Sequence, residues 1–172
     1  MKDATITQHT PRLALGPVLY YWPRETLLAF YRQMSTTPVD IIYLGETVCS
    51  KRRSLKTDDW LELAEQLTAE GKDVVLSTMV LLEAESELKT LRRLCDNGRF
   101  TVEANDMGAV RLLSGKTPFV LGTGINIYND RTLRFLAGLG AHRWIMPVEL
   151  SRTTLACIQT QRPAGMETEI FA

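Results

Sequence analysis

Histidine, cysteine and long apolar runs are all scarce in this sequence, and each scarcity argues against a class of function. The only histidines are His9 and His142, so no HExxH zinc motif and no credible serine or cysteine triad can be assembled. Three cysteines are too few for a disulfide scaffold, and an odd number leaves at least one thiol free. No apolar run approaches the ~20 residues that a membrane-spanning helix needs.

Neither sign of charge is in excess, because 20 Lys and Arg residues balance 20 Asp and Glu residues. A zero net charge gives no global electrostatic reason to bind nucleic acid or an anionic membrane. Residues 1–10 are polar and lack the apolar stretch of a secretory signal peptide. We therefore expect a cytoplasmic protein whose thiols stay reduced and can bind metal, with a disordered polar leader over residues 1–11.

Apolar runs alternate with helical patterns along residues 12–172, which we treat as one domain. The runs are nearly continuous in Val, Ile and Leu, which is typical of a buried parallel sheet covered by helices. Capping residues are expected at Thr57, Asn105-Asp106, Asn129-Asp130 and Ser151. The expected strands cover residues 13–21, 40–45, 73–77, 100–104, 118–122, 143–148 and 166–171.

Two α/β architectures fit this alternation: the doubly wound sheet and the eightfold barrel. The first strand is not followed by GxGxxG, and Gly122-Thr123-Gly124 is too short to be that fingerprint. The sequence therefore predicts a parallel (β/α) TIM-barrel-like domain with about seven strands and six helices. Since a full barrel has eight strands, we expect this one to be incomplete, and either closed by a partner or part of a longer protein.

Cys49 is the strongest candidate for a reactive or metal-binding side chain, because it follows a strand-like run and lies beside Lys51, Arg52 and Arg53. Nearby cations favour the thiolate, which is the form that reacts or binds metal. A lone loop cysteine can equally be a small buried residue, so both interpretations stay open here. The basic cluster, which also includes Lys56, is either a solvated surface or a cationic lip for an anionic substrate or a partner.

Polar residues at the ends of the expected strands form a second set of candidates, because parallel barrels place their chemistry there. Glu103 and Glu149 would line the mouth of the barrel if they point inward, and could then do acid–base work. Asn126 and Tyr128 could hydrogen-bond a ligand or shape a loop. The other residues in this set are Trp22, Glu46, Ser77, Thr78 and Asn105.

Structural explanations are preferred for Asn105 and for four further positions. Asn105 and Ser151 lie where helix caps are expected. Cys95 lies on a leucine-rich helical face and Cys157 in another helical pattern, so both are expected to pack in the core. His142 precedes the sixth expected strand and should lie at the end of the barrel opposite the site.

Several segments resemble the ubiquinone-biosynthesis branch of the collagenase-like peptidase family. The resemblance covers about residues 12 to 172, in order and with few gaps. Its segments are LGPVLYYWP (15–23), YLGETVCSKRR (43–53), VLST (75–78), EAND (103–106) and MPVELSR (146–152).

The resemblance implies a barrel-like domain and a four-iron, four-sulfur (4Fe-4S) cluster held by four cysteines. It also implies a heterodimer with a sister protein, UbiU, that hydroxylates a ubiquinone precursor without oxygen. Cys49 matches the first cluster ligand, whereas Cys95 and Cys157 match none of the other three, which the family places after the seventh strand. Two other functions stay open: a truncated, catalytically silent binding module and a peptidase of the family.

Overall fold

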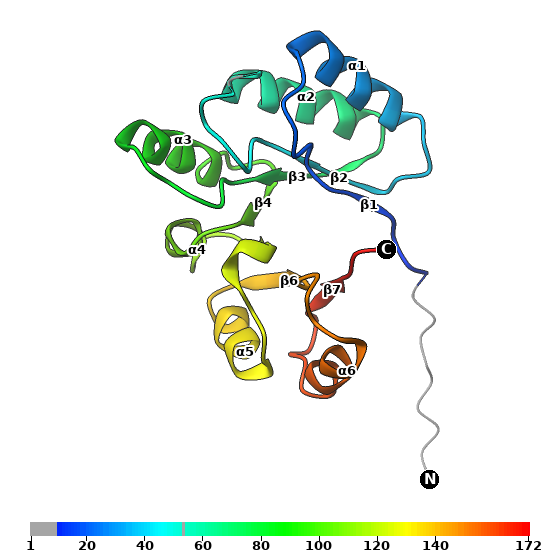
Figure 1. The fold of residues 1–172 in the computed structure, drawn as a ribbon, viewed down its shortest axis with the longest axis vertical. Coiled ribbons are helices and arrows are strands. Elements are labelled where there is room, and N and C mark those ends of the chain that lie inside the picture. Colours follow the sequence, from blue (N-terminus) through cyan, green and yellow to red (C-terminus); the bar gives the residue numbers. More distant parts are fainter. Residues whose placement is uncertain (1–9, 53) are drawn as a thin grey trace.

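The computed structural model describes residues 10–52 and 54–172 (Figure 1). The described chain forms one seven-stranded sheet in which every pair of neighbouring strands is parallel and the strands lie in chain order. Disorder is expected for residues 1–11, of which residues 1–9 lie outside the described part of the chain. The strands are β1 (Ala14–Leu15), β2 (Ile41–Leu44), β3 (Asp73–Ser77), β4 (Thr101–Ala104), β5 (Phe119–Leu121), β6 (Ala141–Ile145) and β7 (Glu167–Glu169).

Helices follow the first six strands and cover the outside of the sheet, which curls into an open half-barrel (Figure 1). This arrangement confirms the predicted TIM-barrel-like fold and its incomplete form. In the part of the chain that is described, no helix combines the length and the apolar character needed to cross a bilayer. The helices are α1 (Arg24–Ser35), α2 (Thr57–Ala69), α3 (Glu85–Cys95), α4 (Met107–Leu113), α5 (Asp130–Gly138) and α6 (Arg152–Thr160), with a 3-10 turn η1 (Thr123–Ile125) after β5.

The core lies on both sides of the sheet because successive strand residues point to opposite faces. On the outer face, Leu44 and Leu76 pack with α1 and α2, while Trp144 belongs to a second cluster that includes residues of α3 to α6. The inner face is narrower and contains a smaller apolar cluster. Its buried members are Ile41, Tyr43, Val75, Val120 and Ile145.

Several local expectations are wrong. The first strand is much shorter than residues 13–21, because only Ala14 and Leu15 pair with β2 and Pro17 has no N–H to extend the ladder. Thr57 is the first residue of α2 and not its cap, since the preceding Lys56 donates its backbone N–H to Asp59 Oδ2 at 2.7 Å. Cys157 is exposed on α6, whereas Cys95 is buried as expected.

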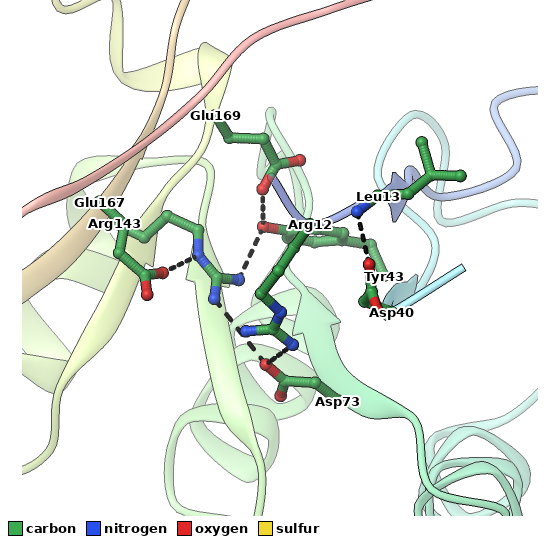
Figure 2. Close-up of polar contacts among 8 residues, drawn as sticks. All are labelled: Arg12, Leu13, Asp40, Tyr43, Asp73, Arg143, Glu167 and Glu169. Carbon is green, nitrogen blue, oxygen red and sulfur yellow. Dashed lines mark hydrogen bonds and ion pairs between the residues drawn. The ribbon is translucent and has the colours of Figure 1, made fainter. Parts of the chain in front are cut away.

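An ionic and hydrogen-bonded network lies inside the half-barrel, toward the end at which β3 begins with Asp73 (Figure 2). Its central residue is Arg143 of β6, whose side chain is only 6% exposed. Arg143 Nε donates to Glu167 Oε2 at 2.6 Å and Nη1 donates to the Tyr43 hydroxyl at 3.3 Å. The Tyr43 hydroxyl in turn donates to Glu169 Oε2 at 2.7 Å. The network therefore joins β2 to β6 and β7 across the interior.

The same network reaches the first strands through Asp73. Its Oδ2 atom lies 2.9 Å from Arg12 Nη2 and 3.8 Å from Arg143 Nη2. Nearby, the Asp40 carboxylate accepts a hydrogen bond from the Leu13 N–H at 2.7 Å (Figure 2). Cations and carboxylates thus alternate from β1 to β7, so that the charge of Arg143 is buried with partners.

Candidate functional site

The mouth of the half-barrel, meaning the carboxyl ends of the strands and the loops that follow them, collects most of the candidate residues. Ser77 of β3 and Glu103 of β4 are direct neighbours in register, and so they lie on the same face of the sheet. Ser77 is 1% exposed and Glu103 is 5% exposed. Within the described residues, neither Ser77 Oγ nor Glu103 Oε2 has a hydrogen-bond partner of good geometry. The mouth therefore has a buried polar floor, in which the Ser77 hydroxyl lies close enough to the Glu103 carboxylate to lower its pKa.

The buried position of Glu103 changes the pKa of its carboxyl group. Burial, which disfavours the charged form, raises its pKa to about 6. The negative charge of Glu169 also raises the pKa, while the adjacent Ser77 hydroxyl and Asn105 amide act in the opposite direction. A carboxyl with a pKa near neutrality can both hold and release a proton under physiological conditions.

Gly122, after β5, makes room for this carboxyl. A Cβ atom at Gly122 would lie 2.0 Å from Asn105 Oδ1 and 2.6 Å from Glu103 Oε1, which are impossible contacts. The glycine pair at 122 and 124 thus has a steric role at the floor. The Gly122-Thr123-Gly124 sequence is the local signal for this feature, although the sequence alone does not show which side chains need the space.

Asn105 is not the helix cap that the sequence predicts. It is buried, its N–H donates to Thr78 Oγ1 at 2.9 Å, and its Nδ2 atom donates to the Thr78 carbonyl at 3.0 Å. The cap of α4 is Asp106, which accepts from the Ala109 N–H at 2.9 Å. Thr78 and Asn105 therefore form a rigid wall beside Glu103, whereas Ser151 does cap α6 as predicted.

Asn126, Tyr128 and Glu149 form a separate, exposed cluster at the mouth. The Tyr128 hydroxyl donates to Glu149 Oε1 and lies 3.2 Å from Asn126 Oδ1. The Tyr128 hydrogen bond lowers the pKa of the Glu149 carboxyl. Glu149 lies in the loop after β6 and makes no hydrogen bond with Glu103 in the described structure, so the two carboxyls occupy different environments.

The loop that carries Cys49 is held in place by Glu46. Glu46 Oε1 accepts hydrogen bonds from the backbone N–H groups of Val48 at 3.0 Å and Cys49 at 3.1 Å. Arg52 lies 3.8 Å from the same carboxylate oxygen and donates to the Leu19 carbonyl at 2.5 Å. Part of the predicted basic lip is therefore occupied by structural contacts, while Lys51 and Lys56 are exposed and Arg53 lies outside the described residues.

An apolar cavity of about 420 Å³ lies beside this loop, between α2 and α3. Glu46, Ser50 and Glu87 provide polar groups in its wall, and the Ser50 hydroxyl donates to Glu87 Oε1. The volume is within the range of small-molecule sites. Sequence reasoning selected Trp22 and Glu46 but not the cavity, because its walls come from three separate segments. Its main apolar residues are Trp22, Leu27, Leu55, Trp60, Leu82, Leu91 and Leu94.

The thiols do not by themselves fit a 4Fe-4S cluster, which needs four thiolates. Cys49 lies half-buried at the mouth, but Cys95 is buried at the end of α3 and burial raises its pKa to about 12. Cys157 is exposed on α6. No group of three or more Cys, His, Asp or Glu side chains in residues 10–52 and 54–172 is placed to hold a metal ion. Among the described thiols, Cys49 is therefore the one that lies at the mouth.

Residues 29–172 match peptidase family U32. No solved structure matches the chain.

Proposed function

The chain belongs to peptidase family U32, and from this membership we propose that it is a UbiV-like iron–sulfur protein. It acts with a UbiU-like partner in the oxygen-independent hydroxylation of a ubiquinone precursor, in the cytoplasm. The family match supports the broad assignment. The five sequence segments that resemble the ubiquinone-biosynthesis branch support the narrower one.

The observation that carries the proposal is the place of Cys49. The 45–56 loop holds this thiol at the carboxyl end of β2, the end of a parallel barrel at which chemistry occurs. Other residues of the loop line the 420 Å³ apolar cavity. A metal ligand beside an apolar cavity suits a hydrophobic ring-bearing substrate.

A 4Fe-4S cluster needs three thiolates besides Cys49, and we propose that they come neither from Cys95, which is buried at the end of α3, nor from Cys157, which is exposed on α6. When bound, a 4Fe-4S cluster supplies one-electron transfer. The contribution of the described residues is to fix the backbone at Cys49 through Glu46 and to exclude water with the apolar walls of the cavity. Lys51 and Lys56 add positive charge on the same loop.

Peptide hydrolysis, which is the activity that the family's name indicates, has less support in the geometry. The described histidine, His142, lies in β6 next to Arg143, near the amino-terminal end of that strand. Burial lowers the pKa of His142, and Cys49 and Ser77 lie at the opposite ends of their strands. No nucleophile at the mouth therefore has a described imidazole as its general base. A silent binding module remains the alternative that predicts no iron.

We expect Cys49→Ser to lower the iron content by at least about tenfold, because loss of a cluster ligand destabilises the cluster more than loss of an outer-sphere group. The measurement is iron and sulfide per protein after co-purification with the partner without oxygen. The absorption spectrum and ubiquinone synthesis in cells grown without oxygen are the second and third readouts.

Cys157→Ser is the matched control, since Cys157 is an exposed thiol on α6, away from the mouth. It should keep the full iron content. Equal iron contents in the two variants would show that Cys49 is not a cluster ligand. Wild-type protein without iron would favour the binding module, and peptide cleavage that persists in Cys49→Ser would favour a peptidase.

A further inference from the structure

Large apolar side chains are exposed on the loops that follow the first three strands. These loops come after β1, β2 and β3 and cover residues 16–23, 45–56 and 78–84. Their exposed apolar residues leave 47–80% of their surface in water, and we call the surface that they form the loop patch. Its members are Leu19, Tyr20, Tyr21, Val48, Val80 and Leu81.

The three loops are hydrogen-bonded to one another, so the loop patch is one surface. The Arg52 guanidinium donates to the Leu19 carbonyl at 2.5 Å, which joins the second loop to the first. The Val80 N–H donates to the Thr47 carbonyl at 3.0 Å, which joins the third loop to the second. The loop patch also adjoins the apolar cavity, because Tyr20 is one of the residues that line it. A continuous exposed apolar surface of this kind is typical of a contact with another molecule.

The area of the loop patch is close to what a protein interface requires. Tyr20 is 80% exposed and Tyr21 is 60% exposed, so these two residues leave about 300 Å² in water if a whole aromatic side chain has ~200 Å². The four aliphatic members are 47–60% exposed and bring the total to roughly 600 Å², the upper end of what a monomer exposes in one patch. A stable interface buries about 800 Å² on each partner, of which a little over half is apolar. The loop patch therefore provides the apolar part of one side of a standard interface.

We propose that the loop patch is the contact between two copies of this chain, which meet across a two-fold axis. Both copies then present the same surface, so the rings and aliphatic side chains of one pack on those of the other. Two copies have no net charge that would keep them apart, because 20 cationic and 20 anionic residues balance in each. The contact does not depend on the iron–sulfur proposal, because it leaves the loops after β4, β5 and β6 open to another partner.

The charges beside the loop patch are complementary to themselves under two-fold symmetry. Lys51 on the second loop and Glu83 on the third loop are both exposed. Between them, Glu87 is engaged within the chain, since it accepts hydrogen bonds from the Ser50 hydroxyl and the Glu83 N–H. In a two-fold contact, Lys51 of each copy can lie against Glu83 of the other. An anionic membrane fits less well, because the exposed carboxylates of Glu83 and Glu85 would face its head groups.

The first test measures the oligomeric state of the purified chain by sedimentation velocity over a range of micromolar concentrations. We expect the wild type to form a concentration-dependent dimer. Tyr20→Asp should raise the dissociation constant of the dimer at least about tenfold, because it replaces an aromatic anchor with a charge. Phe135→Asp is the matched control, since Phe135 is 63% exposed but lies on α5, away from these loops, and this variant should dimerise like the wild type.

Charge reversal tests the two-fold arrangement itself. Lys51→Glu alone and Glu83→Lys alone should each raise the dissociation constant about threefold or more, since each variant creates two contacts between like charges. The double variant should return to the wild-type dissociation constant, because both signs are then exchanged in both copies. Equal melting temperatures of the variants would show that the fold itself is unchanged.

A wild-type chain that stays monomeric throughout the micromolar range would overturn the inference. So would a dimer that Tyr20→Asp leaves intact, or a double charge variant that does not regain affinity. Two results would give the loop patch another occupant and would equally overturn it. One is a wild-type monomer whose binding to the UbiU-like partner is lost in Tyr20→Asp, and the other is a monomer that co-sediments with phosphatidylglycerol vesicles. Iron content in Cys49→Ser is measured independently, so failure of the cluster proposal and failure of this one are distinguishable.

Discussion

Arg143→Ala is expected to lower the free energy of unfolding by about 3 kcal/mol. The Arg143 side chain is 6% exposed, and its guanidinium contacts Glu167, Tyr43 and Asp73. Its removal leaves those groups without a counter-charge and opens a cavity inside the half-barrel. We expect the low end of the range for a broken buried pair, because the Glu167 and Asp73 side chains are 53% and 41% exposed. Urea unfolding, followed by tryptophan fluorescence, measures the loss.

The matched control for this variant is Arg134→Ala. Arg134 pairs with Asp130 at 2.5 Å on α5, four residues apart, and their side chains are 51% and 29% exposed. Exposed helical pairs of this kind contribute about 0.3–0.5 kcal/mol. If both alanine variants cost the same small amount, the interior network is not what holds β6 and β7 to β2 and β3.

Gly122→Ala is expected to destabilise the fold by about 3 kcal/mol or to prevent it from forming, although it adds a single methyl group. The new Cβ would meet Asn105 Oδ1 at 2.0 Å, and Asn105 cannot yield without breaking its bond to the Thr78 carbonyl. The Glu103 carboxyl would also be displaced, because its Oε1 atom lies 2.6 Å from the same point. Thermal unfolding at pH 7 reports the loss.

Gly138→Ala is the appropriate comparison, since a Cβ there meets nothing within 4 Å at the end of α5. It should be neutral or stabilise by up to about 1 kcal/mol, as alanine favours helix over glycine. A mild effect of Gly122→Ala, similar to that of Gly138→Ala, would show that the floor of the mouth can expand.

The alternation of strands and helices could be predicted from sequence because it is a local property. The Val-Val-Leu run of β3 is apolar on both faces, and only a parallel sheet covered by helices buries both. Glu103 and Ser77 could be placed at the mouth by the rule that chemistry follows strand ends. Whether Glu103 points inward could not be predicted, because it depends on where β4 begins, and one residue of slip turns every side chain over.

Other features of the site depend on contacts between distant segments and left no local signal. Asn105 resembles a helix cap because Asp106 beside it is one, and only the partner strand shows that its amide is bonded to Thr78. Cys157 has the neighbours of a buried residue in sequence but lies on the solvent side of α6. The cavity is formed by side chains from three segments that meet only in the folded chain.

The hydrogen bond from Tyr43 to Glu169 joins residues 126 positions apart, and the bond from Arg143 to Tyr43 joins residues 100 apart. Contacts of such long range form slowly, since a long loop must close before they contribute. During synthesis, β2 and β3 emerge long before their polar partners in β7. Tyr43 therefore lies in an incomplete interior until β7 arrives, and a nascent chain stopped before β7 should be the species most in need of a chaperone.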